Sequence, residues 1–398
     1  MTAASASERV RYRTALVIPE FRALFAAYSI STLGSVSLTV ALTVLVYERT
    51  GSPVLSALAF ALGFLPYIVS GLLLSALVDR LPPRRLLVAS DVACTLLVLA
   101  MAWPRMPIAA VLGLLFLVGG ITSISGGTRN AVVRAVVGDD AFIPARSLLR
   151  ISAQSAQVIG NGVGGLLLIV LAPRSLILVD AVSFALSALI TRARLQDRPA
   201  ATVAGSSPLL LDSLRGVGAI LRDPTVRRLL LFGWLLPPFS VVPEALAAPY
   251  VLGGGYSRAV VGWWLVALPV GVITGDVIGV WFLTPSRQRR LIAVIAAVGF
   301  VPYVAFAARP SVALAIPLLI VSGLGSGYFL GLDGLLRDAV PPPLFPRTMA
   351  INSAGLMTIQ GLGFAAAGAV AELVSPAAAI AGAGVLGLSA IAVLRPRN

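Results

Sequence analysis

The stretch SALVDRLPPRRLL, residues 75–87, joins two long apolar segments of the chain. The flanking segments, residues 53–78 and 86–103, are each near the roughly 20 residues that a helix needs to cross a bilayer. The stretch therefore predicts two membrane-spanning helices joined by a short charged loop. The charged residues of this loop are Asp79, Arg80, Arg84 and Arg85.

The composition of the whole chain also indicates a membrane protein. Its 398 residues are 58% hydrophobic and 12% charged, with a mean hydropathy of +0.96, whereas soluble domains are about 25% charged. The 30 basic residues are all arginines, and they lie in short runs between apolar segments. Membrane topology explains such runs, so we do not expect nucleic acid as a partner.

Ten further apolar stretches are long enough to cross a membrane, so we predict an all-α membrane protein with twelve transmembrane helices. Most connections are short and carry proline or glycine, as in RTGSP and AARPS. The predicted spans are residues 21–47, 53–78, 86–103, 107–128, 143–171, 175–192, 228–251, 259–283, 291–308, 311–332, 348–371 and 376–394.

The distribution of arginine predicts the orientation of these spans. Connections after odd-numbered spans carry at most one arginine, whereas those after even-numbered spans and both tails carry clusters. Loops rich in basic residues stay on the cytoplasmic side. We therefore expect a multi-pass protein of the plasma membrane with both termini in the cytoplasm. Residues 1–20 lack a signal-peptide cleavage site and are interpreted as a cytoplasmic tail.

The connection after the sixth span is much longer than the others. It combines a polar segment with an amphipathic stretch that begins LLLDSLRGVGAILR. We predict an N-terminal tail and six-helix bundle over residues 1–192, a cytoplasmic linker with an amphipathic helix over 193–227, and a second six-helix bundle over 228–398.

The two predicted bundles show an internal repeat. A shift of 203 residues aligns identical residues in the same order and in the same spans. Two parallel six-span repeats around a site near the middle of the membrane are typical of secondary transporters. The aligned pairs are Arg134 with Arg337, Phe142 with Phe345, Gln157 with Gln360, Gly160 with Gly363, Gly165 with Gly368 and Pro173 with Pro376.

The charged loop resembles the Gly-x-x-x-Asp-Arg-x-Gly-Arg-Arg signature of the major facilitator superfamily. Asp79 and Arg80 match it, Ser75 and Pro82 stand for the glycines, and the arginine pair is shifted by one. In the fifth span, GNGVGG is similar to the exporter-associated Gly-Pro-x-x-Gly-Gly motif, with Asn161 in the proline position. FRALF, YERTGSP and DAVSF resemble the branch of enterobactin exporters and macrolide efflux pumps. The resemblance implies the major facilitator fold.

The chain departs from that branch at two places that concern proton coupling. Ser35 stands after LG in the first span, where the branch often has an acid. The fourth span, residues 107–128, carries no charge, although many proton-coupled exporters have an arginine motif there. Proton antiport is thus implied by the resemblance more than by these spans.

Several classes of chemistry are excluded by the residues that the chain lacks. It has no histidine and a single cysteine, Cys94, so it offers no imidazole or multi-thiolate metal site and no Ser-His or Cys-His catalysis. It also has no phosphate loop for ATP. We therefore expect no enzymatic activity, no cofactor and no metal, and any proton transfer must use carboxylates.

A first group of candidate residues concerns gating. The resemblance implies that Asp79 interacts with the start of the eleventh span, near Thr348, and a carboxylate is favoured at a helix N-terminus. The alternative is a merely solvated loop. We expect Asp91 to pair with Arg129 or Arg134 on the cytoplasmic side. The gating candidates are Asp79, Arg80, Arg84, Arg85, Asp91, Arg134, Arg150 and Asp276.

A second group lies on the fifth span. Five polar residues at spacings of 4, 4, 3 and 4 share one face of a helix. Charge at bilayer depth costs roughly 2.5 to 3.5 kcal/mol per residue, so this polar stripe should face a cavity, or other helices, instead of lipid. In the implied fold the fifth span faces the eighth, and Arg150 and Asp276 have similar depths, so we expect an ion pair between them. The alternative is that Asp276 pairs within its own half and Arg150 reaches the lipid phosphates. The polar stripe is Arg146, Arg150, Gln154, Gln157 and Asn161.

Two further carboxylates are candidates for proton coupling. Glu244 lies in LLPPFSVVPEALAAPY, and proline interruption within a span frees backbone groups and often marks a transporter site. A hydrogen-bonded carboxylate at the end of the span is the alternative. Asp180 lies about one turn inside the sixth span, where either packing or proton transfer explains it. The substrate-binding candidates are Gln154, Gln157, Asn161, Tyr28, Trp234 and Glu244.

Together these features predict a secondary active transporter that exports small amphipathic organic molecules in exchange for protons. Uptake of a polar nutrient by the same fold and lipid scrambling by a different class of protein are the alternatives. The expected partners are a small-molecule substrate, protons and the lipid bilayer, and the expected state is a monomer.

Overall fold

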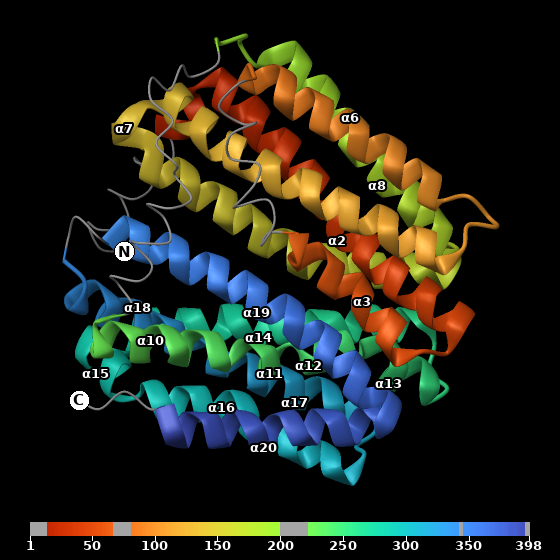
Figure 1. The fold of residues 1–398 in the computed structure, drawn as a ribbon, viewed down its shortest axis with the longest axis vertical. Helices are drawn as coiled ribbons and strands as arrows, with labels where there is room; N and C mark the ends of the chain where they lie inside the picture. Colours follow the sequence, from red (N-terminus) through yellow and green to blue (C-terminus); the bar gives the residue numbers. More distant parts are fainter. Residues whose placement is uncertain (1–13, 67–80, 200–221, 342–344, 395–398) are drawn as a thin grey trace. The chain divides into compact units, whose positions relative to one another are not determined.

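The computed structural model describes residues 14–66, 81–199, 222–341 and 345–394. Within these ranges the regular elements are all helices (Figure 1). A helix satisfies its own backbone hydrogen bonds, which a water-free bilayer core requires. The predicted all-α membrane fold is therefore confirmed.

Contacts divide the chain into two compact units. The first contains Met1–Leu42 and Pro66–Ala204, and the second contains Thr43–Leu65 and Gly205–Asn398. The unit boundaries thus cut through the first long helix, whose last residues pack with the second unit. The predicted boundaries at 192 and 228 remain a prediction, and most of the amphipathic linker lies outside the described residues.

The described residues of the first unit form four long helices, coloured red to green in Figure 1. Within it α6 packs along both α7 and α8. Proline occupies the first turn of α6 and of α8, where its missing N–H group costs no hydrogen bond. The helices are α2 (Pro19–Thr50, up to Leu42 in this unit), α6 (Pro83–Met101), α7 (Ile108–Val170) and α8 (Pro173–Arg194).

Helix α7 contains the predicted fourth and fifth spans. Gly138, with φ 72°, interrupts it and separates the segments Ile108–Gly138 and Pro144–Val170. The predicted end of the fourth span at residue 128 was therefore too early. The helix continues to the first glycine with a left-handed backbone, a conformation that glycine adopts without steric cost. Arg129 and Arg134 consequently lie on helix instead of in a loop.

The second unit contains the remaining elements. Here α3 packs along α19, α14 along α17, and α16 along α20. The elements are α3 (Pro53–Phe64), α10 (Pro224–Leu235), α11 (Pro237–Ser240), α12 (Val242–Ala245), α13 (Ala247–Gly253), α14 (Arg258–Phe282), α15 (Pro285–Arg290), α16 (Ile292–Val304), η1 (Ala305–Ala308), α17 (Val312–Leu324), η2 (Gly325–Gly327), α18 (Tyr328–Ala339), α19 (Phe345–Leu373) and α20 (Pro376–Leu394).

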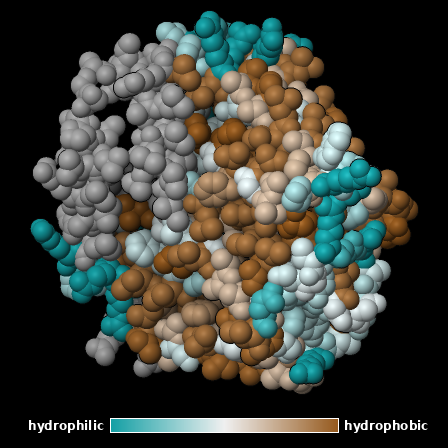
Figure 2. Space-filling view, turned by 45° about the vertical axis from the view of Figure 1, so that its right-hand side comes forward, coloured by the Kyte–Doolittle hydropathy of each residue, from teal (hydrophilic) through white to brown (hydrophobic). Residues whose placement is uncertain are grey.

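The helices of the described residues are consistent with twelve spans. Nine helical segments are long and apolar enough to cross a membrane, and Pro53–Phe64 and Ile292–Ala308 are shorter apolar helices. Helix α6 lies at the predicted third span and carries three charged residues. On the face shown in Figure 2, hydrophobic side chains cover a broad area and hydrophilic ones lie mainly toward its edge.

Glycine allows α14 and α17 to approach very closely. A Cβ atom added to Gly271 would overlap the Ile320 carbonyl oxygen and lie 2.8 Å from Cα of Gly323. A Cβ atom on Gly323 would in turn overlap the Leu268 carbonyl oxygen. Such backbone contact gives van der Waals packing, which drives helix association where lipid removes the hydrophobic driving force.

We expect Gly271→Ala to destabilise the second unit. The added methyl group must push two helix backbones apart, and overpacking of this kind costs about 1–3 kcal/mol. The matched control is Gly382→Ala in α20, where an added Cβ meets no atom within 4 Å. Thermal unfolding of the purified protein in detergent should show a lower midpoint for Gly271→Ala alone. Equal midpoints for the two variants would contradict the close packing.

Candidate functional site

The polar stripe lies on the second segment of α7. Arg146, Arg150 and Gln154 are exposed, Gln157 is half-buried, and Asn161 is buried. The accessibility of the stripe thus decreases from Arg146 toward Asn161.

The same helix has a second exposed face, which is apolar. Ile151, Ile159 and Leu166 are among its exposed hydrophobic side chains. Ile159 follows Arg150 by nine residues and so lies about 180° around the helix from it. An apolar face suits contact with lipid, whereas the stripe of the opposite face requires water or other polar groups.

The glycines of GNGVGG hold α7 against α2. A Cβ atom on Gly160 would lie 2.8 Å from Val36, and one on Gly164 would lie 3.5 Å from Cα of Ser37. Hydroxyl groups add hydrogen bonds along the same contact, because Ser29 and Ser152 lie 2.7 Å apart and Ser37 donates to the Gly160 carbonyl oxygen. These glycines therefore have a packing role within the first unit.

Arginine side chains in this unit lie over aromatic rings. The Arg129 guanidinium carbon is 4.7 Å from the ring centre of Tyr28. Arg134 and Arg146 both approach the ring of Phe142, at 5.7 and 5.8 Å. Such contacts stabilise a cation beside an aromatic face. Tyr28 was predicted from the sequence to bind substrate, and in the structure its ring makes a cation–π contact with Arg129.

Asp91 is a buried carboxylate in α6. The hydroxyl group of Ser187 donates a hydrogen bond of 2.6 Å to its Oδ2 atom. Arg129 is the cation whose charge acts on it. The structure thus places near Asp91 one of the two arginines that we expected to pair with it, and adds a serine of α8 that the sequence did not indicate.

Asp180 is fully buried between α2 and α8. Its Oδ1 atom accepts hydrogen bonds from Ser183 at 3.0 Å and from Ser35 at 3.5 Å. Its Oδ2 atom has no hydrogen-bond partner among the described residues. Glycine at position 34 is required, because a Cβ atom there would lie 2.5 Å from Oδ1 of Asp180.

Polar residues follow one face of α8 through the interior of the first unit. Asp180, Ser183, Ser187 and Thr191, at spacings of 3, 4 and 4, are all buried. We call these four residues the α8 polar seam. Two of its members hydrogen-bond to carboxylates, Ser183 to Asp180 and Ser187 to Asp91. The seam therefore contains Asp180 and connects α8 with Asp91 of α6.

The charged loop is described only at its end. Asp79 and Arg80 lie outside the described residues, so their predicted roles remain predictions. Arg84 donates a hydrogen bond of 2.5 Å to the carbonyl oxygen of Arg192, and Arg85 lies 3.6 Å from Asp197. Both arginines therefore hold the start of α6 to the end of α8, although an exposed pair such as Arg85 with Asp197 contributes only about 0–1 kcal/mol.

In the second unit, prolines break the seventh span into four short helices, α10 to α13. Two side chains satisfy carbonyl groups in the broken region. Trp264 donates a hydrogen bond of 2.8 Å to the carbonyl oxygen of Pro243, and Tyr303 donates one of 2.9 Å to that of Ser240. The predicted proline interruption is confirmed, and the indole and phenol groups replace hydrogen bonds that a regular helix would have made.

Glu244 lies within this broken region. Its side chain borders a cavity of about 10 Å³, with Trp264, Leu268 and Leu319 among the other lining residues, which is close to the volume that one water molecule occupies. Within the described part of the chain, its carboxylate makes no hydrogen bond and no ion pair. The alternative stated from the sequence was a carboxylate held by hydrogen bonds at the end of the span. The described residues supply no such hydrogen bond to Glu244.

The other candidates of the second unit have different surroundings. Trp234 donates a hydrogen bond of 3.1 Å to the carbonyl oxygen of Asn352 and packs on Gly355, where an added Cβ atom would overlap its ring. Asp276 is half-buried in α14. Arg150 belongs to the other unit, so the expected ion pair between Arg150 and Asp276 remains a prediction.

Charged contacts that the sequence analysis did not identify lie where α2 ends and α3 begins. Arg258 of α14 forms an ion pair with Glu48, and the hydroxyl group of Ser52 donates to Glu372 of α19. Further along α3, Phe60 and Phe64 stack on Phe364 of α19. All of these residues belong to the second unit. The chain has only 16 acidic residues. An acid at the end of a span, such as Glu48 or Glu372, was therefore the sequence signal that could have identified these contacts.

Long apolar helices, a broken span with a carboxylate and buried polar groups define a polytopic helical membrane protein with the features of a transporter. The sequence model of the Major Facilitator Superfamily matches residues 24–245. The chain therefore belongs to the Major Facilitator Superfamily, which is a family of transporters.

Curated relatives and solved structures agree with this membership. An uncharacterized MFS-type transporter of Sinorhizobium fredii is 26% identical over 383 residues, 92% of this chain and 91% of that protein. Macrolide efflux protein A of Streptococcus pyogenes is 25% identical over 165 residues, 40% of this chain and 41% of that protein.

Solved transporters share the fold at low identity. The nucleoside transporter NupG has a TM-score of 0.72 at 15% identity over 94% of this chain and 100% of its own. A D-xylose-proton symporter has a TM-score of 0.66 at 14% identity over 97% of each chain.

We expect the ion pair between Glu48 and Arg258 to stabilise the end of α2. Either reversal alone, Glu48→Arg or Arg258→Glu, replaces an attraction of about 0.2–1 kcal/mol with repulsion of similar size. The midpoint of thermal unfolding should therefore fall by a few degrees in each single variant. The double variant should recover most of that loss. A double variant that unfolds as early as the worse single one would show that the two charges do not interact.

Proposed function

We propose that this protein is a secondary active transporter that exports small amphipathic organic molecules in exchange for protons. The observation that carries the proposal is the broken seventh span, where Glu244 lies beside a small cavity without a hydrogen-bond partner among the described residues. Interrupted helices are where transporters place their substrate and ion sites. The similarity to macrolide efflux protein A and the GNGVGG motif favour export over uptake.

Two sets of residues would contact the substrate. In the first unit these are Gln154, Gln157 and Asn161 of the polar stripe, together with Tyr28. In the second unit they are Trp234 and Glu244. Amide groups form hydrogen bonds without carrying charge, and aromatic rings offer apolar surface, so the combination suits a molecule that is apolar with a few polar groups.

Two carboxylates, Glu244 and the buried Asp180, support coupling to protons. Neither Glu244 nor Asp180 forms an ion pair within the described residues, and Oδ2 of Asp180 has no hydrogen-bond partner there. An isolated carboxylate inside a protein is costly, and uptake of a proton removes its charge. Either group would then alternate between a charged and a neutral form as the protein changes conformation.

Gating residues lie at both ends of the spans in this proposal. Asp79, Arg80, Arg84, Arg85, Asp91, Arg134, Arg150 and Asp276 would act on the cytoplasmic side that the arginine distribution predicts. On the other side, the contacts of Glu48 and Ser52 with Arg258 and Glu372 would hold the ends of α2 and α3 against α14 and α19. Alternating access requires that these contacts form in one state and break in the other.

An efflux screen tests the proposal. Expression in a host that lacks its own drug pumps should lower the cellular content of some macrolides, dyes or siderophores, and a protonophore should abolish the effect because the gradient drives export. Substrate accumulation instead of loss would indicate uptake. Lipid transfer in liposomes without any ion gradient would indicate scrambling.

Glu244→Gln should abolish gradient-driven export but preserve substrate binding. The amide keeps the size of the side chain but carries no titratable proton, so export should fall at least about tenfold. Glu244→Asp should restore part of it, and Asp338→Asn, at an exposed carboxylate, should leave export unchanged. Export by reconstituted protein under an imposed pH gradient, with binding measured separately, distinguishes these cases. Full pH-dependent export by Glu244→Gln would assign the role to another carboxylate such as Asp180.

A further inference from the structure

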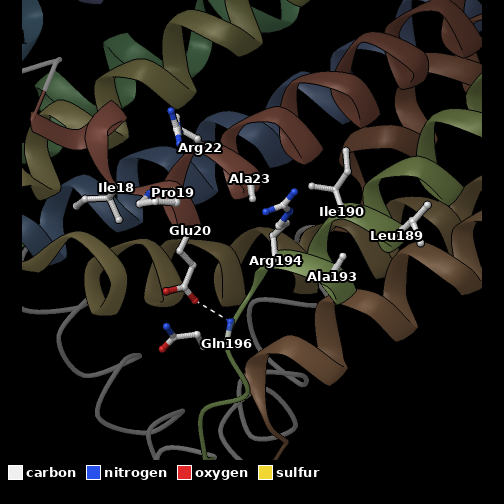
Figure 3. A pocket seen from close by; sticks show the side chains of 10 residues that line it. All are labelled: Ile18, Pro19, Glu20, Arg22, Ala23, Leu189, Ile190, Ala193, Arg194 and Gln196. Carbon is white, nitrogen blue, oxygen red and sulfur yellow. Dashed lines mark hydrogen bonds between the residues drawn. The ribbon is translucent and has the colours of Figure 1, made fainter.

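An open cavity of about 780 Å³ lies in the first unit, where α2 begins and α8 ends (Figure 3). Its walls combine apolar side chains with two arginines, Arg22 of α2 and Arg194 of α8. Ile18, Ala23 and Ile190 are among the apolar residues. The cavity is separate from the polar stripe of α7 and from Glu244, so the proposed transport site does not account for it.

The acidic residue of the cavity is already neutralised. Both carboxylate oxygens of Glu20 accept hydrogen bonds from Arg198, at 2.5 and 2.8 Å, and Oε1 also accepts the backbone N–H of Gln196. The hydrogen bond to Glu20 raises the pKa of Arg198 above its usual value, so this pair stays ionised. Figure 3 shows Glu20 turned toward Gln196 and Arg22 directed the opposite way.

The two remaining arginines leave the cavity with a net positive charge. Arg22 and Arg194 are exposed, and neither has an anionic partner among the described residues. Figure 3 shows Arg194 extending from α8 toward Ala23 on α2. A ligand that binds here must therefore offer an anion that guanidinium groups recognise, such as a phosphate group.

The apolar part of the ligand follows from the surface next to the cavity. Leu189, which lines the cavity, is 63% exposed. Exposed Leu186 and Val182 continue from it along α8, at spacings of 3 and 4 residues. This apolar row leads from the arginines into the part of the helix that spans the bilayer. A phosphate with acyl chains fits both features, whereas a free phosphate would use only the arginines.

We propose that this cavity binds the phosphate head group of an anionic phospholipid, with an acyl chain lying along Leu189, Leu186 and Val182 of α8. Basic pockets between spanning helices at the membrane boundary bind such head groups. The lipid would join α2 to α8 at the same end that the Glu20 to Arg198 pair already connects.

Native mass spectrometry of the full-length protein in detergent tests the proposal. Dioleoyl phosphatidylglycerol is titrated against the wild type and against Arg22→Gln with Arg194→Gln, and dioleoyl phosphatidylcholine serves as the neutral lipid. We expect the anionic lipid to remain bound to the wild type and to bind the double variant at least about tenfold more weakly. Arg22→Lys with Arg194→Lys should bind nearly as well as the wild type, because the charge is kept.

The matched control is Arg222→Gln with Arg290→Gln. It removes two exposed arginines of the second unit that do not line the cavity, and it should bind the anionic lipid like the wild type. Equal weakening in both glutamine variants, or equal binding of both lipids by the wild type, would overturn the proposal. Displacement of the lipid by glycerol 3-phosphate or by inorganic phosphate at low concentration would also overturn it, because the site would then recognise a free anion.

Discussion

The absence of water in the bilayer core is the constraint on which the rest of this structure depends. Every backbone N–H and carbonyl group within the core needs a partner from the protein. Regular helices supply it in most of the described chain, and where prolines break the seventh span Trp264 and Tyr303 donate to the carbonyl groups of Pro243 and Ser240. The break can therefore persist inside a packed unit, and it is what leaves Glu244 beside a cavity instead of within a regular turn.

The same constraint explains how the first unit holds two carboxylates in its interior. Asp91 and Asp180 accept hydrogen bonds from serines of α8, and Asp180 also from Ser35 of α2. Glycine at position 34 makes the close approach to Asp180 possible. In lipid, small residues and hydroxyl groups thus hold helices together, whereas apolar packing does so in soluble proteins. Asp180 nevertheless retains one oxygen without a partner among the described residues, which distinguishes it from Asp91 as a candidate for proton uptake.

Much of the architecture could be predicted from the sequence because the signals are local. Long apolar stretches, arginine runs and punctuating prolines predicted helices that span a membrane, and the charged loop with GNGVGG predicted the superfamily. The proline cluster around Glu244 predicted an interrupted helix, since proline removes a backbone donor wherever it stands. The end of the fourth span was predicted too early because the helix continues to Gly138, whose left-handed backbone interrupts it. The sequence does not show which of its many glycines adopts that conformation.

By itself, then, the sequence determined that this is an all-helical membrane protein of a transporter family and which residues share a helix face. Only the tertiary structure decided which of those residues meet. Ser35 with Asp180, Glu48 with Arg258 and Glu20 with Arg198 are separated by more than a hundred positions in the chain. Periodicity along one helix contains no information about the rotation and register of the helix beside it, and those two quantities decide whether a polar side chain meets a partner, a cavity or lipid.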